Sequence, residues 1–297
     1  MSSSRISRRA FLTATAVAAV SLQSRLAAAD AASRMKGRVN HSVCKWCYPK
    51  ISLDDLCAAG KPMGLASVEL VAPADFPTLK KHGLTCAMTT FPTIEGPDGK
   101  KLGTIELAFN RVEHHDLLVK AYEPYIDAVS DAGFKNLICF SGNRGGMNDE
   151  MGLKNCAEGL KRILPQAEKR GVVICMELLN SRVNHPDYMC DKSAWGIELC
   201  KRIGSAHFKL LYDIYHMQIM EGDVIATIKR DQQYFAHYHT GGVPGRHEID
   251  DTQELNYAAI MRAIVETGYK GHVAQEFIPA RPDALASLRE AVVICDV

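Results

Sequence analysis

Four side chains able to bind a metal or move a proton each close a short apolar segment: Glu177, Asp213, His239 and Glu276. The segments are Val172–Glu177, Phe208–Asp213, Tyr234–His239 and Gly271–Glu276. Ends of parallel strands in a closed barrel meet at one rim, where catalytic groups are found. Carboxylates crowded there repel one another unless a cation lies among them. Mixed oxygen and nitrogen donors suit Mn²⁺, Mg²⁺, Co²⁺ or Zn²⁺, so we predict a divalent metal site.

Eight short segments, apolar almost throughout, are typical of strands covered on both faces. They are Arg38–Val43, Ser67–Val71, Leu84–Thr89, Asn136–Phe140, Val172–Glu177, Phe208–Asp213, Tyr234–His239 and His272–Phe277. Helical patterns separate them: one opens at Ser52, and the others cover Val112–Ala132, Asn148–Arg170, Ser193–Ile203, Glu254–Thr267 and Asp283–Ile294. Strands alternating with helices indicate a parallel sheet, and eight such units predict an α/β fold, a (β/α)₈ barrel formed by a single domain.

Residues 1–29 have the pattern of an export signal, with a basic start, a weakly apolar stretch and the small residues Ala27–Ala29. Ser7–Leu12 is a twin-arginine pattern, which addresses folded proteins to the Tat export machinery and predicts a periplasmic or exported protein. The alternative is a retained membrane anchor, for which the apolar stretch is short. We therefore predict a cleaved signal over 1–29 and a barrel over 30–297, close to the ~250 residues such a fold uses.

The charge is nearly balanced, with 35 basic and 34 acidic residues and a formal net charge of +1. Nucleic acids and anionic membranes require clustered basic surface, so neither is an expected partner. The ten cysteines lie in predicted core segments more than in loops, which predicts mostly free thiols, with Cys44 and Cys47 left open. The irregular stretch Phe91–Thr104 follows the third predicted strand and is either a partial cover of the site or a surface loop.

Motifs after the last four predicted strands point to a known family. They are Met176–Arg182, Tyr212–Gln218, His237–Glu248 and Gln275–Phe277. Together they resemble the xylose-isomerase-like TIM barrels, which are sugar isomerases and epimerases, and within them the hydroxypyruvate isomerase branch. That branch commonly has Gln at the position of His239, where ketose epimerases of the same fold have His.

The resemblance implies one divalent metal held by four ligands, which correspond to Glu177, Asp213, His239 and Glu276. It also implies that the two glutamates act as acid and base, and that the substrate is a small sugar or hydroxy-carbonyl compound. The positions of His216 and Arg246 hold substrate oxygens in the family; the alternatives are a loop histidine bonded to backbone and a surface ion pair with Glu248 or Asp250. Asn180 either orients substrate or fixes its loop. A homo-oligomer is possible.

Proton removal beside a carbonyl is the chemistry that such a site supports, since a metal polarises the carbonyl and stabilises the enediolate. One carboxylate then takes the proton and another returns it. Three alternatives remain open at this point: a lyase or dehydratase that uses the same site on oxidised sugars or glycosides, a multi-zinc phosphodiesterase, and a sugar-binding barrel without activity. His237 points to the same side as His239, one layer deeper, where we expect a buried imidazole bonded to neighbours.

Overall fold

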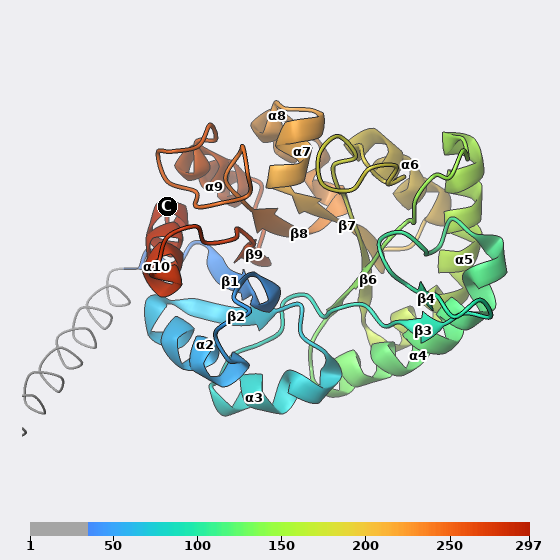
Figure 1. Ribbon diagram of the computed structural model, residues 1–297, viewed down its shortest axis with the longest axis horizontal. Coiled ribbons are helices and arrows are strands. Elements are labelled where there is room, and N and C mark those ends of the chain that lie inside the picture. Colours follow the sequence, from blue (N-terminus) through green and yellow to red (C-terminus); the bar gives the residue numbers. More distant parts are fainter. Residues whose placement is uncertain (1–34) are drawn as a thin grey trace, which may run out of the picture.

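The computed structural model describes residues 35–297, so the predicted signal over 1–29 lies outside the described residues and stays a prediction. A curved parallel sheet of seven strands forms the centre, in the order β2-β1-β9-β8-β7-β6-β5, and the helices surround it (Figure 1). The strands are β1 (Asn40–Cys44), β2 (Leu65–Glu69), β5 (Asn136–Cys139), β6 (Val173–Glu177), β7 (Phe208–Asp213), β8 (Phe235–Thr240) and β9 (His272–Gln275). The long α-helices are α4 (His115–Asp131), α5 (Asp149–Arg170), α6 (Ser193–Ile203), α9 (Tyr257–Glu266) and α10 (Ala284–Cys295).

The predicted strand Leu84–Thr89 is wrong as a regular strand, although the segment does occupy the eighth barrel position between β2 and β5. It makes only two isolated bridges, Ser67 to Thr85 and Thr89 to Leu137. Side chains interrupt the ladder at its middle: the Ala87 amide donates to Ser67 Oγ at 2.8 Å, and the Ala87 carbonyl accepts from Asn136 Nδ2 at 2.8 Å. On either side of Ala87 the segment bonds to the neighbouring strands, for example from the Leu70 amide to the Met88 carbonyl at 2.8 Å; at Ala87 itself side chains satisfy the backbone groups.

The predicted helix that opens at Ser52 is confirmed as α2 (Leu53–Gly60), which the Ser52 side chain caps. The predicted helix Val112–Ala132 begins with a 3₁₀ turn at Val112–His114 and continues as α4. The remaining short elements were not predicted: α3 (Phe76–Lys81), α7 (Ile214–Met220), α8 (Val224–Asp231), the two-residue strands β3 (Ile94–Glu95) and β4 (Lys101–Leu102), and 3₁₀ turns at Lys45–Cys47, Lys61–Met63, Pro73–Asp75 and Gln232–Tyr234. The pair β3–β4 makes a hairpin of the stretch predicted to be irregular. The predicted helix Glu254–Thr267 begins three residues late because Asn256 caps it, its side chain accepting from the Ala259 amide.

Capping side chains and glycines fix where the helices begin and end, and so where the chain passes between helices and strands. Asn148 caps α5 by accepting from the Met151 amide, and α5 ends at Gly171 with φ +70°. Glycine is favoured there because a side chain disfavours the left-handed region. Asp213 caps α7 directly after β7, so its carboxylate is held at the rim of the barrel. All ten cysteines are free and buried, which agrees with the prediction of mostly free thiols and answers the open question at Cys44 and Cys47. Within 35–297, no helix is both long and apolar enough to cross a bilayer.

A buried histidine in β1 makes the stability of the fold depend on pH. His41 is 1% exposed, neither ring nitrogen has a hydrogen-bond partner within residues 35–297, and the nearest acid is Asp296 at 3.9 Å from Nε2. Burial lowers the pKa of His41 from 6.5 to about 4, because the imidazolium loses its hydration.

Between pH 6.5 and 4 the unfolded chain therefore binds the proton at His41 that the folded chain does not bind. We expect the contribution of His41 to the free energy of unfolding to be fully present above pH 6.5. This contribution should fall by about 3 kcal/mol as the pH drops to 4. Urea unfolding of the wild type and His41→Gln across this range checks it. The variant should lose that part of the pH dependence, and an equal slope in the two proteins would contradict the assignment.

Candidate metal centre

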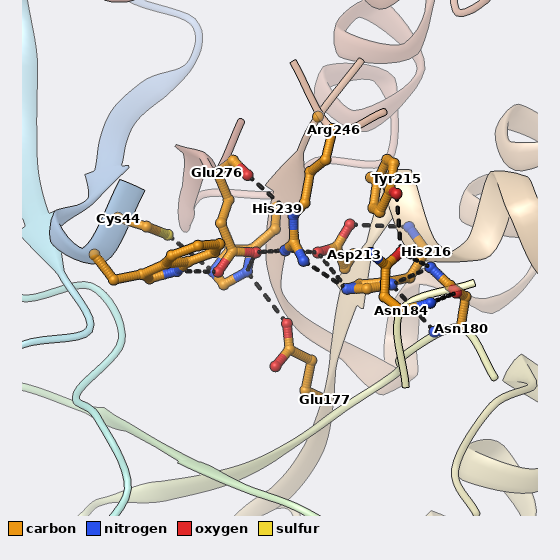
Figure 2. Close-up of polar contacts among 12 residues, drawn as sticks. Cys44, Glu177, Asn180, Asn184, Asp213, Tyr215, His216, His239, Arg246 and Glu276 are labelled. Carbon is orange, nitrogen blue, oxygen red and sulfur yellow. Dashed lines mark hydrogen bonds and ion pairs between the residues drawn. The ribbon is translucent and has the colours of Figure 1, made fainter. Parts of the chain in front are cut away.

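The four predicted ligands converge at the C-terminal rim (Figure 2). Glu177 ends β6, Asp213 ends β7, His239 lies in β8, and Glu276 follows β9 directly. Each offers one ligand atom, and these four atoms all lie within 4.8 Å of one another. His239 Nδ1 is central, 2.6 Å from Glu276 Oε2 and 3.5 Å from Glu177 Oε1. Residues almost a hundred positions apart thus form one buried cluster.

Arg246 is buried inside this cluster and is not on the surface. Its Nη2 donates to Asp213 Oδ2 at 2.9 Å and to Glu276 Oε2 at 2.5 Å, so the alternative of a surface ion pair with Glu248 or Asp250 is wrong. The guanidinium also lies between the rings of Trp46 and Tyr215, at 5.3 and 5.1 Å from their centroids. Ion pairs and flanking aromatic rings together fix its position.

The backbone at Arg246 is strained to place this side chain. Its φ is +61°, in the left-handed region that costs an L-residue of order 1 kcal/mol or more. Two backbone hydrogen bonds hold it there, from the Arg246 amide to the Gly242 carbonyl at 2.8 Å and from the Ile278 amide to the Arg246 carbonyl at 2.7 Å. Strain of this kind persists where the surrounding structure requires it and is typical of functional sites.

The two glutamates have opposite electrostatic environments. Burial raises the pKa of Glu177, whose carboxylate has His239 as its only ion-pair partner within residues 35–297. Burial acts on Glu276 as well, but His239 and Arg246 outweigh it and hold the pKa of Glu276 well below its usual value. Trp46 Nε1 donates to the other oxygen of Glu276 at 2.7 Å. These environments therefore favour the protonated form of Glu177 and the ionised form of Glu276.

A divalent cation fits the charge and the donors of the cluster. Three carboxylates and the Arg246 guanidinium leave two negative charges when His239 is neutral. The buried His239 Nδ1 has no properly aligned hydrogen-bond partner within residues 35–297, although carboxylate oxygens surround it. Burial also raises the pKa of Asp213 well above its usual value, so protons neutralise the cluster when a cation does not. Glu177, Asp213, His239 and Glu276 are the residues that would hold the ion.

His216 and Asn180 lie behind Arg246, outside the residues that line the cavity. His216 Nε2 is 3.0 Å from Arg246 Nη1, and its Nδ1 accepts from the Asn180 amide at 3.1 Å. Burial, followed by the charge of Arg246, lowers the pKa of His216 well below its usual value, so the imidazole is neutral. Asn180 Oδ1 accepts from the amides of Val183 and Asn184, which fixes the loop after β6. The substrate-binding roles of His216 and Asn180 stay predictions; their contacts position the arginine.

A cavity of about 350 Å³ opens beside the cluster. Its polar wall is formed by Glu177, His185, Arg246 and Glu276. The remaining lining is mostly apolar: Trp46, Leu70, Thr90, Phe91, Ile105, Ile138, Phe140 and Leu179. Phe91, at the start of the stretch predicted to be irregular, packs edge-on against Phe140 with 4.9 Å between ring centroids. The segment Phe91–Thr104 therefore contributes to the cavity wall, which favours the prediction of a partial cover.

Glu69 at the end of β2 belongs to the site although no role was predicted for it. It lies below the cluster with an exposed fraction of 0%, bonded to His237 and His239. The expected burial and bonding of His237 are thus confirmed. A lone acid at a strand end carries little signal, because many such acids have no functional role; the available indication was the pair of histidines two residues apart, since buried imidazoles need hydrogen-bond partners.

A family model described as a xylose isomerase-like TIM barrel matches residues 77–292. The chain belongs to this family. Among curated relatives of this xylose isomerase-like barrel, the 2-oxo-tetronate isomerase of Cupriavidus necator is 38% identical over 113 residues, which are 38% of this chain and 43% of the relative. Hydroxypyruvate isomerase of Escherichia coli is 27% identical over 148 residues, 50% of this chain and 57% of the relative. The chain thus spans about half the length of these relatives.

Among solved structures, one titled AP endonuclease, family 2 from Brucella melitensis superimposes with a TM-score of 0.71 at 24% identity. The superposition covers 84% of this chain and 96% of the Brucella melitensis chain. At this identity the likeness shows the fold, and it confirms the predicted TIM barrel. The expected resemblance to hydroxypyruvate isomerases is also confirmed, by the curated relative from Escherichia coli.

Proposed function

We propose that this protein is a divalent-cation-dependent isomerase or epimerase of a small hydroxy-carbonyl compound or sugar. The observation that carries the proposal is the pair Glu177 and Glu276, which line one cavity, contact one imidazole nitrogen and have pKa values shifted in opposite directions. The isomerase names of the curated relatives support the reaction class.

In the proposed reaction, the ionised carboxylate of Glu276 accepts a proton from a substrate carbon, and Glu177, whose raised pKa favours its protonated form, returns a proton to the substrate. The two glutamates exchange protonation states in this step, so no net proton is gained or lost. Arg246 lies at the cavity wall, where its contacts with Asp213, Glu276 and His216 fix the guanidinium and leave one N–H on Nη1 to orient a substrate oxygen. A bound divalent ion would polarise the carbonyl and stabilise the negative charge that develops on oxygen.

Exchange of substrate hydrogen with solvent tests the proposal directly. We expect the purified protein, loaded with Mn²⁺, to incorporate deuterium from D₂O into a panel containing hydroxypyruvate, 2-oxo-tetronate and ketohexoses, without loss of a leaving group. The protein treated with a chelator should not exchange. Release of water or an aglycone would replace the isomerase with the lyase alternative, and binding without exchange would leave a sugar-binding barrel.

The phosphodiesterase alternative lacks the metal ligands that it needs. Several zinc ions require separate ligand sets. Within residues 35–297, all three groups with metal-binding spacing share His239. We therefore do not propose a nuclease.

A further inference from the structure

A second polar network lies directly beneath the candidate metal centre, in the floor of the barrel. Glu69 Oε1 is 2.9 Å from His239 Nε2 and 2.7 Å from His237 Nε2, and Glu69 Oε2 accepts from Ser42 Oγ at 2.5 Å. These four side chains have exposed fractions of 0% and come from β1, β2 and β8. His239 belongs to both layers, since its Nδ1 faces Glu276 and Glu177 and its Nε2 faces Glu69.

The contact with Glu69 determines which nitrogen of His239 carries a proton. An ionised carboxylate only accepts hydrogen bonds, so the nitrogen facing Glu69 must be the donor. When His239 is neutral, its single proton is then on Nε2 and the lone pair is on Nδ1, inside the carboxylate cluster. The other contacts of Glu69 agree with this, because Ser42 Oγ donates to Oε2 and the second imidazole, that of His237, lies 2.7 Å from Oε1, so both oxygens serve as acceptors.

Glu69, His237 and His239 also have metal-ligand spacing. Their oxygen and nitrogen atoms, 2.7 and 2.9 Å apart, are at hydrogen-bond distance. All three side chains have exposed fractions of 0%, and none of them except His239 reaches the upper cluster. We therefore assign the lower layer the role of a hydrogen-bonded support.

We propose that Glu69 is a positioning residue for the metal centre: it holds His239 with Nε2–H donated downward and the Nδ1 lone pair directed at the ion, and so sets the affinity for a divalent cation. This inference rests on the proposed function, since it concerns the same ion. Ser42 and His237 hold Glu69 in turn. Outer carboxylates that orient a metal-binding imidazole typically contribute roughly 10- to 100-fold to metal affinity.

Mn²⁺ titration of Glu69→Gln, followed by electron paramagnetic resonance of the free ion, tests the proposal. We expect the wild type to bind one ion per chain and Glu69→Gln to bind it roughly 10- to 100-fold more weakly. Ser42→Ala is the matched control, because it removes the contact to Oε2 and leaves Oε1 on His239; it should weaken binding far less. Should Glu69→Gln not fold, Glu69→Asp, which keeps the charge but shortens the reach, replaces it and should also bind more weakly.

Thermal unfolding of the metal-free proteins separates positioning from a purely structural role. A structural role would lower the midpoint of Glu69→Gln and leave its dissociation constant for Mn²⁺ unchanged, which would overturn the proposal. Two Mn²⁺ ions per wild-type chain would also overturn it, by placing an ion in the lower layer. A wild type that binds no divalent cation overturns the proposed function together with this inference, whereas equal affinities in wild type and variant overturn this inference alone.

Discussion

Glu177→Gln and Glu276→Gln are each expected to lower turnover by roughly 10²- to 10⁴-fold, the range that one acid or base group contributes. Glutamine keeps the shape of each side chain but cannot exchange a proton with substrate. Deuterium incorporation and product formation, both measured at saturating Mn²⁺, check this, since saturation compensates for any loss of metal affinity. Circular dichroism should show both variants folded, because each substitution removes a charge from a crowded cluster of carboxylates.

Glu221→Gln is the matched control. Glu221 accepts hydrogen bonds from the backbone and hydroxyl of Ser193 and lies outside the residues that line the cavity. Its substitution should leave turnover unchanged. Near-wild-type turnover in either Glu177→Gln or Glu276→Gln would remove that residue from the proton transfer, and would leave it as a metal ligand at most.

Arg246→Met is expected to separate substrate binding from metal binding. Loss of a buried, paired guanidinium costs about 2 kcal/mol or more, so we expect kcat/KM to fall by roughly 30-fold or more. The same change removes a positive charge 2.9 Å from Asp213 and 2.5 Å from Glu276. Affinity for Mn²⁺ should therefore rise, by about tenfold or more, because the ion no longer competes with the guanidinium.

Steady-state kinetics and Mn²⁺ titration of the same preparation measure both effects. Arg202→Met is the control, because Arg202 pairs with Glu150 and Glu198 on the outer helices. It should change neither quantity. Weaker Mn²⁺ binding in Arg246→Met would contradict the prediction, and would mean that the guanidinium aligns the ligands more than it repels the cation.

Much of the barrel was predictable because strands buried on both faces have a continuous apolar signal. The predicted range Phe208–Asp213 is β7 itself, and the predicted range Ser193–Ile203 is α6 itself. The prediction was wrong where side chains replaced backbone pairing, as Ser67 and Asn136 do at Ala87. Such a substitution leaves the apolar pattern of a strand intact, so the pattern alone cannot reveal it.

The convergence of the four predicted ligands could be predicted from their places at strand ends, since a parallel barrel brings these ends together at one rim. The contacts of Arg246 did not, because they depend on a loop whose left-handed backbone turns the side chain inward. Glu69 was missed for a different reason. It lies 168 residues before His237, and only the closure of β2 against β1, with β8 two positions further, brings the two side chains within reach.

The interrupted strand pairing at Ala87 affects which substrates the cavity can admit. Thr90 and Phe91, which line the cavity, follow the segment Leu84–Thr89 directly along the chain. Backbone hydrogen bonds at Thr85, Met88 and Thr89 join this wall to its neighbours, but at Ala87 two side chains replace them. We expect such a wall to open at lower energy than one joined by a full strand ladder, because fewer backbone bonds must break. The apolar wall of the cavity, which includes Phe91, is therefore expected to adapt its shape, whereas the charged wall around Arg246 is held rigid. The apolar wall would then accept substrates with different tails, and the charged wall on the opposite side would select the arrangement of the reacting carbons.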